Sequence, residues 1–455
     1  MTRPCVRGAV VLALLVLPVL AWAQGPQRAT PNETARARNA VAVATSRGCW
    51  LELGHACIVS DLERLPVVDD VVRYRFKVRI GPGPFDVIRM HRVVRERRPF
   101  VPARTSEALF TLHGSGFGFE YSFLANVATG LRPPAQAMPV FLAQRGVDVW
   151  GMDLGWVLVP PDTKDLSFFA DWGLDKEVAQ TRAGLGIARA IRALTSGDAG
   201  RMDFLGWSYG GLIGYVLVSS ESQLPAWRRH VKRFIPVDMV MKFEPGTVPD
   251  WVCPTADWYK ARHESGDYAD DYSYYATIGA LAISDPTATS PDFAPLTNEQ
   301  AILYLGTAPG GPTPAFHLVA GVFDEGGTPI GLEYTQKDLF VYAYAGGVSL
   351  DGMVWWASVL TAVDQYGIWC DATDVPFDNH LGDVRIPTFF LGTTSMGPAG
   401  VYSTTLLGSR DVTTRIVSLK PAGQEANDYG HWDLWLADNA AKLVWQPILD
   451  WLKKH

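Results

Sequence analysis

The stretch Asp203-Phe204-Leu205-Gly206-Trp207-Ser208-Tyr209-Gly210-Gly211 decides the fold of this 455-residue chain. Two apolar residues lead into the pattern Gly-x-Ser-x-Gly, and an apolar segment over 212–218 follows it. This order predicts a buried strand that turns sharply into a helix and presents Ser208 between the two. Gly206 and Gly210 suit such a turn, because side chains at these positions would collide with neighbouring backbone.

Further strands and helices alternate on both sides of this stretch. Apolar strands are expected over 108–112, 147–150 and 234–237, and helices over 138–144 and 175–194. Strands that are apolar along their whole length, separated by helices, predict a mostly parallel sheet with helices on both faces.

An antiparallel hairpin is expected ahead of the parallel strands. Apolar residues alternate with basic ones over 71–80, Gly81-Pro82-Gly83-Pro84 forms a turn, and 85–94 is the return strand. The basic side chains of the first strand should face water. They are Arg73, Arg75, Lys77 and Arg79.

The alternation stops over 245–383, which is rich in aromatic residues, proline and glycine. We interpret this segment as an inserted cap or lid, helical over 338–366. The sheet then resumes at 387–391 and 414–419, and Pro447 should kink or split a closing helix over 433–453.

The N-terminal residues 1–23 are typical of a signal peptide. Arg3 and Arg7 are followed by an apolar run that is too short to span a bilayer, and Ala21-Trp22-Ala23 is a cleavage site. We therefore expect a secreted or periplasmic protein with no transmembrane segment in its mature chain. Residues 24–70 form an N-terminal leader or extension, poorly ordered over 24–44.

Four cysteines lie outside the signal peptide, and an even number in an exported chain favours two disulfides. Pairing Cys49 with Cys57 and Cys253 with Cys370 keeps near neighbours together, while the other two pairings stay open.

Composition and motifs exclude several classes of partner. The formal charge is −7 without a long basic cluster, which argues against nucleic acid or an anionic membrane surface. No Cys or His spacing fits a zinc site, and Gly306–Gly311 lacks the lysine of a phosphate-binding loop. We expect no cofactor and no metal.

Three segments together carry a family resemblance. They are the strand end at His113-Gly114, the turn over 206–210, and Gly430-His431 ahead of the last helix. In this order the chain resembles the α/β-hydrolase fold, in particular its lipases and esterases. The resemblance covers 71–244 and 384–455, and implies a mostly parallel, doubly covered sheet with an N-terminal antiparallel hairpin and an inserted cap.

The resemblance implies that Ser208 is a nucleophile. A serine hydroxyl needs an adjacent base to accept its proton, and His431 has the right position, after the last strand. The other histidines precede the parallel strands, lie in the insertion, begin a strand or end the chain. The exception is His113, which we expect to order the loop that follows it.

The resemblance also implies an oxyanion hole of backbone N–H groups. One is expected from Tyr209, after the nucleophile, and one from Ser115, with Gly114 or Gly116 as alternatives.

The acid partner of the histidine departs from the family pattern. The family usually places it after the seventh strand, but residues 392–409 contain neither Asp nor Glu. Asp238 ends the sixth strand, where some members carry their acid, and an unpaired carboxylate in its apolar run would be costly. Asp411 is the next candidate, a loop-capping role for Asp238 stays open, and three acids in the insertion remain. They are Asp324, Asp374 and Asp378.

The sequence thus predicts an exported serine hydrolase that cleaves carboxylic esters, small or lipid-like, through Ser208, His431 and Asp238 and an acyl-enzyme. An acyltransferase or peptidase with the same residues is an alternative. So is a catalytically inactive binding protein on the same fold. Substrate chain length and oligomeric state stay open.

Overall fold

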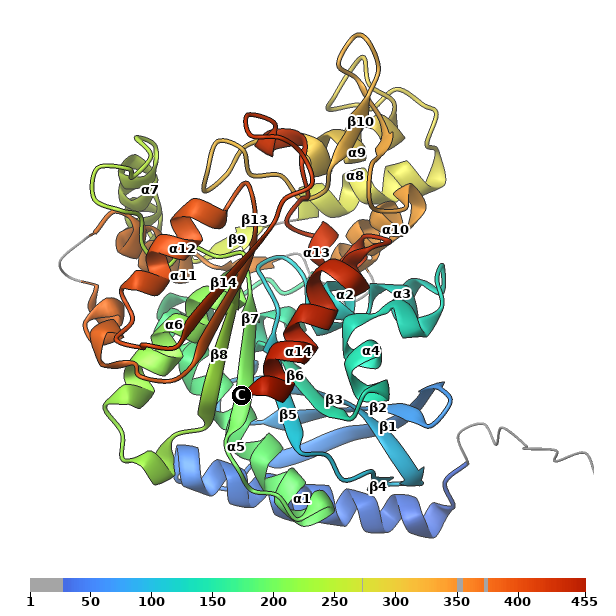
Figure 1. Ribbon diagram of the computed structural model, residues 1–455, viewed down its shortest axis with the longest axis vertical. Helices are drawn as coiled ribbons and strands as arrows, with labels where there is room; N and C mark the ends of the chain where they lie inside the picture. The colour runs from blue at the N-terminus through green and yellow to red at the C-terminus, as the bar shows by residue number, and fades with distance from the viewer. Residues whose placement is uncertain (1–27, 272, 350–354, 372–374) are drawn as a thin grey trace, which may run out of the picture.

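The computed structural model describes residues 28–271, 273–349, 355–371 and 375–455. Its centre is a ten-stranded sheet in the order β1-β2-β3-β6-β5-β7-β8-β13-β14, with β4 paired to β3 (Figure 1). The pairs from β6 to β14 are parallel, whereas β1, β2 and β3 form an antiparallel end. The strands are β1 Ile58–Val68, β2 Val71–Arg79, β3 Val87–Arg98, β4 Val101–Pro102, β5 Glu107–Leu112, β6 Val147–Asp153, β7 Met202–Trp207, β8 Val231–Val237, β13 Thr388–Thr393 and β14 Val412–Val417.

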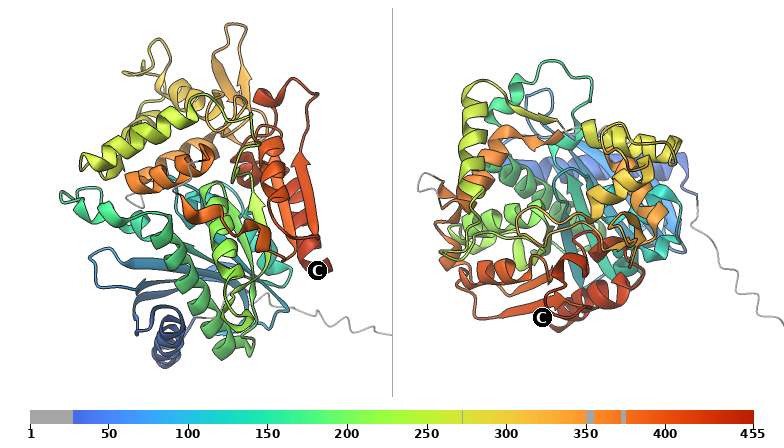
Figure 2. Two further views of the ribbon diagram at one scale, coloured as in Figure 1. Left: turned by 90° about the vertical axis from the view of Figure 1, so that its left-hand side faces the viewer. Right: turned by 90° about the horizontal axis from the view of Figure 1, so that it is seen from above.

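Helices cover both faces of this sheet (Figure 2). Helices α1, α5 and α6 pack together on one side, and α4 packs against β6 and the turn that precedes α14. The predicted fold class is confirmed. The helices of this part are α1 Pro31–Leu53, α2 Phe119–Phe123, α3 Ala125–Thr129, α4 Met138–Gln144, α5 Leu174–Ser196, α6 Tyr209–Ser222, α12 Gly397–Thr405, α13 Asp433–Leu436 and α14 Gln446–Lys454.

Short helical turns connect these elements. The 3₁₀ turns are η1 Pro134–Gln136, η2 Gly155–Leu158, η3 Ser167–Asp171, η4 Ala226–Arg228, η5 Pro376–Asp378, η6 Leu381–Asp383 and η7 Glu425–Asn427. A π-helical turn, η8 Ala441–Trp445, leads into α14, where Pro447 stands in the first turn. The expected closing helix is therefore interrupted at residues 437–439, between α13 and η8, whereas Pro447 lies within the continuous helical run from η8 into α14, so the break is not at Pro447.

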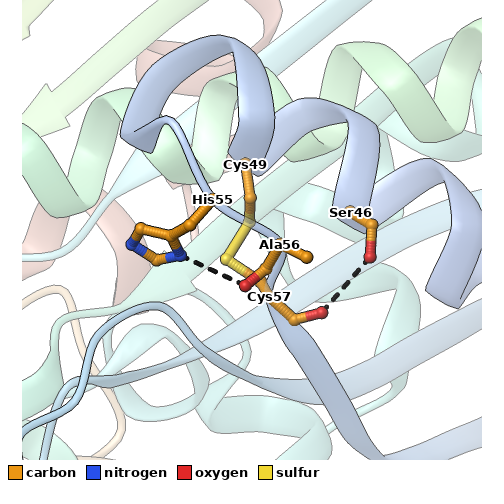
Figure 3. The surroundings of a disulfide bond; sticks show 5 residues. All are labelled: Ser46, Cys49, His55, Ala56 and Cys57. Atoms are coloured by element: carbon orange, nitrogen blue, oxygen red, sulfur yellow. Dashed lines mark hydrogen bonds between the residues drawn. A yellow bond between two sulfur atoms is a disulfide. The ribbon is translucent and has the colours of Figure 1, made fainter.

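The N-terminal extension is more ordered than the sequence suggested. Helix α1 begins at Pro31 because Thr30 and Glu33 form a capping box there, so the prediction of a poorly ordered segment over 24–44 is wrong from this point. A disulfide between Cys49 and Cys57 then joins α1 to the start of β1, the edge strand of the sheet (Figure 3).

The prediction that the basic side chains of β2 face water is wrong for Arg73. This side chain is 2% exposed, and its guanidinium donates to Glu120 Oε2 at 2.6 Å. Glu120 belongs to α2, about fifty positions away in the chain, so the sequence pattern of β2 alone could not show this partner.

The inserted segment forms its own set of elements above the sheet in the left view of Figure 2. The expected helix over 338–366 is in fact α10 and α11, separated by β12. Cys253 of α7 is disulfide-bonded to Cys370 at the end of α11, which confirms the second predicted pairing. The elements are α7 Val252–Glu264, β9 Ala269–Asp271, α8 Ser273–Ser284, α9 Asn298–Thr307, β10 Gly321–Phe323, β11 Pro329–Leu332, α10 Lys337–Ser349, β12 Trp355–Ser358 and α11 Val359–Trp369.

Two expectations of the sequence remain predictions. The division into 24–70, 71–244 with 384–455, and 245–383 is one of them. The signal peptide over 1–23 is the other, since it lies outside the described residues. Among the described helices, none is both long and apolar enough to cross a membrane.

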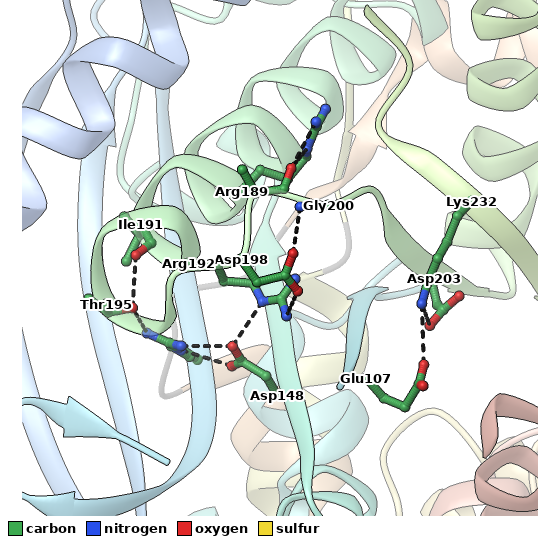
Figure 4. A network of polar contacts seen from close by, with 12 residues as sticks. Glu107, Asp148, Arg189, Ile191, Arg192, Thr195, Asp198, Gly200, Asp203 and Lys232 are labelled. Carbon is green, nitrogen blue, oxygen red and sulfur yellow. Dashed lines mark hydrogen bonds and ion pairs between the residues drawn. The ribbon is translucent and has the colours of Figure 1, made fainter. Parts of the chain in front are cut away.

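A buried ionic network ties β3, β6 and α5 together (Figure 4). Asp148 of β6 accepts hydrogen bonds from Arg92 at 2.7 and 2.8 Å and from Arg192 at 3.1 Å. None of the three residues is more than 3% exposed. Two guanidinium groups thus share the Asp148 carboxylate, and Arg192 also donates to Asp198 at 2.8 Å, so Asp148 compensates the buried charge of Arg92 and part of that of Arg192.

Replacing Asp148 with alanine should therefore be strongly destabilising. We expect Asp148→Ala to lower the free energy of unfolding by about 3–5 kcal/mol, because it removes the buried carboxylate that pairs with Arg92. The matched control is Asp70→Ala, which removes an exposed pair with Arg95 and should cost about 1 kcal/mol or less. Urea unfolding of both variants measures the difference, and equal losses would contradict the role assigned to the network.

Candidate active site

Ser208 occupies a strained turn between β7 and α6. Its backbone has φ 55° and ψ −128°, in a region that a residue with a side chain rarely adopts. Both flanking glycines make this turn possible. A Cβ on Gly206 would lie 2.1 Å from the carbonyl oxygen of Gly210, and a Cβ on Gly210 would lie 2.5 Å from that of His113.

His431 lies in the loop between β14 and α13 and is 3% exposed. Its Nδ1 is 2.7 Å from Asp238 Oδ2, so this nitrogen carries the hydrogen that the carboxylate accepts. The imidazole stacks on the ring of Trp207 at a centroid distance of 4.9 Å and contacts the tilted ring of Phe316 at 5.0 Å. These contacts fix the orientation of the ring.

Asp238 follows the last residue of β8 and is fully buried. Its Oδ1 accepts the backbone N–H of Thr393 at 2.7 Å and the Thr393 hydroxyl at 3.1 Å. Thr393 ends β13, the neighbouring strand. A buried carboxylate is tolerated here because donors from His431 and Thr393 replace the water that it has lost.

Asp411, the alternative acid, lies elsewhere. It is exposed and precedes β14, and its carbonyl oxygen accepts the N–H of Thr388, the first residue of β13. It therefore lies at the end of the strands opposite to Asp238. Its carboxylate is 3.7 Å from Nε2 of the C-terminal His455.

The acids of the insertion have other partners or lie outside the described residues. Asp324 accepts backbone N–H groups of its own turn, and Asp378 pairs with Lys242. Asp374 falls in a stretch that the structure does not describe.

The loop after β5 passes directly over Ser208. A Cβ on Gly114 would lie 2.8 Å from Cβ of Ser208, so only glycine allows this approach. His113 is fully buried, with Nδ1 2.7 Å from the Gly114 carbonyl oxygen and Nε2 accepting the N–H of Leu154 at 3.3 Å. Burial lowers the pKa of His113, and a neutral ring makes one donor and one acceptor bond. These contacts fit the predicted role in ordering the loop.

The far end of this loop is held by Asp153 at the end of β6. Its Oδ1 accepts the N–H of Phe119 at 2.6 Å, and its Oδ2 lies 2.9 Å from His91 Nε2. Burial alone would raise the pKa of Asp153, but the Arg89 guanidinium and His91 hold this pKa well below its usual value. The loop over Ser208 is thus anchored at both ends.

Ser208 and His431 line one cavity of about 330 Å³ together with the predicted oxyanion residues Ser115 and Tyr209. Tyr209 begins α6, so its N–H has no partner inside the helix and belongs to the positive end of the helix dipole. The rest of the lining is largely aromatic and comes from the sheet, its loops and the insertion. Examples are Phe117, Trp251, Phe316, Tyr344, Tyr366 and Trp369.

Asp433 holds the His431 loop against the insertion. Its Oδ2 accepts the N–H groups of Gly430 and Ala320, both at 2.8 Å, and its Oδ1 accepts the Thr335 hydroxyl at 2.6 Å. Burial raises the pKa of Asp433 to about 6.

Asp433 should make stability depend on pH. Because its folded-state pKa is raised above the unfolded value, the stability it contributes is complete below about pH 4 and is lost as the pH rises through about 6. In Asp433→Asn this position no longer titrates. We expect the native protein to lose more stability than the variant between pH 4 and 7, by a difference on the order of 1–3 kcal/mol. Unfolding in urea at both pH values measures it, and parallel losses would contradict this pKa.

Sequence reasoning missed Thr393, Asp433 and Glu177. Glu177 accepts the Tyr209 hydroxyl and had a visible signal, since it lies on the buried face of α5 with Thr181 and Ala188. Thr393 and Asp433 had none, because their partners come from distant segments.

Within the described part of the chain, no cluster of His, Cys, Asp or Glu side chains could hold a metal ion.

Comparison with known proteins identifies the fold. No family model and no curated protein matches the chain. Among solved structures, a putative lipase from Sulfolobus solfataricus superposes with a TM-score of 0.61 at 19% identity, over 87% of this chain and 99% of the other. A soluble variant of monoglyceride lipase from Saccharomyces cerevisiae has a TM-score of 0.43 at 11% identity, over 88% of this chain and 96% of the other. The chain has the α/β-hydrolase fold.

Proposed function

We propose that this chain is an exported serine hydrolase that cleaves carboxylic esters. The observation that carries the proposal is the 2.7 Å contact between His431 Nδ1 and Asp238 Oδ2, with His431 and the strained Ser208 lining the same cavity. The contact leaves His431 Nε2 free of its proton and able to act as a base.

In the proposed reaction, Ser208 Oγ attacks the carbonyl carbon of the ester and His431 Nε2 accepts its proton. The resulting imidazolium is stabilised by Asp238 through Nδ1–H. His431 then protonates the leaving alcohol, which departs as the acyl-enzyme forms. A water molecule, deprotonated by the same histidine, then attacks the acyl carbon; the bond to Ser208 Oγ breaks, His431 returns the proton to Oγ, and the acid leaves.

The carbonyl oxygen becomes negative in both steps and needs donors that are already in place. Tyr209 N–H at the start of α6 and Ser115 N–H in the loop over the serine are the proposed pair. The close approach of Gly114 to Ser208 supports this assignment, because it brings the loop backbone beside the reacting oxygen.

The cavity favours an apolar acyl or aromatic group. Its lining is mostly aromatic, and its volume of about 330 Å³ lies at the low end of ligand pockets, so short and medium acyl groups fit better than long chains.

We also infer that the protein is exported. The basic and apolar residues over 1–23 support a signal peptide, and the two disulfides suit an oxidising compartment outside the cytoplasm. Whether this is the periplasm or the medium depends on the cell envelope.

Replacing the nucleophile tests the reaction. We expect Ser208→Ala to fold normally and to lose turnover of p-nitrophenyl butyrate by about 10³-fold or more, because no oxygen remains to form the acyl-enzyme. Esterase rates and circular dichroism measure the two properties. Full activity in this variant would refute the proposal.

A fluorophosphonate probe separates the enzyme from an inactive protein on the same fold. The native protein should be labelled at Ser208 and the alanine variant should not. An intact native protein that resists labelling would support the inactive alternative.

The acid is tested by two matched substitutions. Asp238→Asn should lower kcat by about 10³- to 10⁴-fold, because the amide no longer holds His431 in its productive tautomer. Asp411→Asn, at the other end of the strands, should leave kcat within about two-fold of the native value. The reverse pattern would transfer the role to Asp411.

A further inference from the structure

A carboxyl group that the proposed reaction does not use lies beneath the turn at Ser208. Glu177 of α5 is fully buried, and the Tyr209 hydroxyl donates a hydrogen bond to its Oε2. Tyr209 is itself 2% exposed. The residue whose N–H is the proposed oxyanion donor is thus anchored at its other end by Glu177.

The surroundings of this pair favour its uncharged form. Burial, followed by repulsion from the nearby Asp364, raises the pKa of Glu177 to about 8. Burial and Glu177 also raise the pKa of the Tyr209 phenol well above its usual value. Both shifts favour the protonated forms of the two groups, so a neutral acceptor at position 177 can serve in this bond.

The same carboxyl reaches the insertion through α11. Thr361 Oγ1 lies 3.4 Å from Glu177 Oε1 and 3.1 Å from the carbonyl oxygen of Trp172. One turn further along α11, Asp364 accepts the N–H of Leu174, the first residue of α5, at 2.8 Å. Helix α11 also supplies Tyr366 and Trp369 to the wall of the cavity. Glu177 thus lies where the core, the turn at Ser208 and the insertion meet.

We propose that Glu177 is a positioning residue, which holds Tyr209 so that its backbone N–H points at the oxyanion formed on Ser208. This inference rests on the proposed function and deepens it.

Tyr209 is a single residue whose backbone and side chain are both held in place. The N–H of Tyr209 follows Ser208 directly, and its side chain ends at Glu177. An oxyanion donor acts only within about 2.7–3.1 Å of the oxygen, so a small rotation of this residue weakens it. The donor acts on the transition state more than on the bound ester. Loss of the anchor should therefore lower kcat and leave KM nearly unchanged.

Three variants test the anchor. Glu177→Ala and Tyr209→Phe each remove one partner of the bond but keep the Tyr209 N–H, and each should lower kcat by about 10- to 100-fold with KM within about two-fold. The kcat of the double variant should be about the same as that of the less active single variant, because both substitutions break the same hydrogen bond. Glu177→Gln supplies an uncharged acceptor of the same shape and should restore most of kcat.

Glu221→Ala is the matched control for general destabilisation. Glu221 is a buried carboxylate at the far end of the same helix, α6, where it accepts the N–H groups of His230 and Val231. Its loss should lower the melting temperature and leave kcat unchanged.

Kinetics with p-nitrophenyl butyrate and melting curves give the readouts. Native kcat in Glu177→Ala, losses that multiply in the double variant, or an equal loss of kcat in Glu221→Ala would each overturn the role of Glu177. If Glu177→Ala does not fold, Tyr209→Phe and Glu177→Gln carry the test. A native protein without esterase activity would instead refute the proposed function.

Discussion

The left-handed backbone of Ser208 is the constraint on which the rest of the site depends. A φ of 55° is unfavourable for serine, and it persists because the surroundings leave no alternative. The Ser208 N–H donates to the carbonyl oxygen of Val237 in the neighbouring strand, and the loop at Gly114 closes over the side chain. Strand β7 cannot relax this turn without disturbing both neighbours.

The register of the parallel strands places the acid beside the turn at Ser208. Trp207 pairs with Val237, so Ser208 and Asp238 follow paired residues and emerge at the same level of the sheet. Leu391 also pairs with Val237, which places the end of β13, with Thr393, beside the carboxylate. Sheet hydrogen bonds, rather than the side chains themselves, therefore set the spacing between the serine and the acid.

The sequence could predict features that depend on residues close together in the chain, but not contacts between distant segments. Gly206, Gly210 and the apolar strands carry their reason within a few residues, so the turn and the parallel sheet were predictable. Asp238 was preferred because a carboxylate in an apolar run needs a partner, and the structure pairs it with His431. The burial of Arg73 and the second donor to Asp238 depend on contacts between segments far apart in the chain. No pattern within a single element records such contacts.

The insertion contributes to the site in two different ways. The His431 N–H donates to the His317 carbonyl oxygen, and the Phe316 ring contacts the imidazole at a centroid distance of 5.0 Å, so 316–320 is part of the frame that orients this ring. Helix α11 instead supplies the cavity wall and meets the core at Glu177. Residues 316–320 therefore cannot shift without moving the backbone at His431 and Trp432, because His317 and Leu318 accept the N–H groups of these two residues.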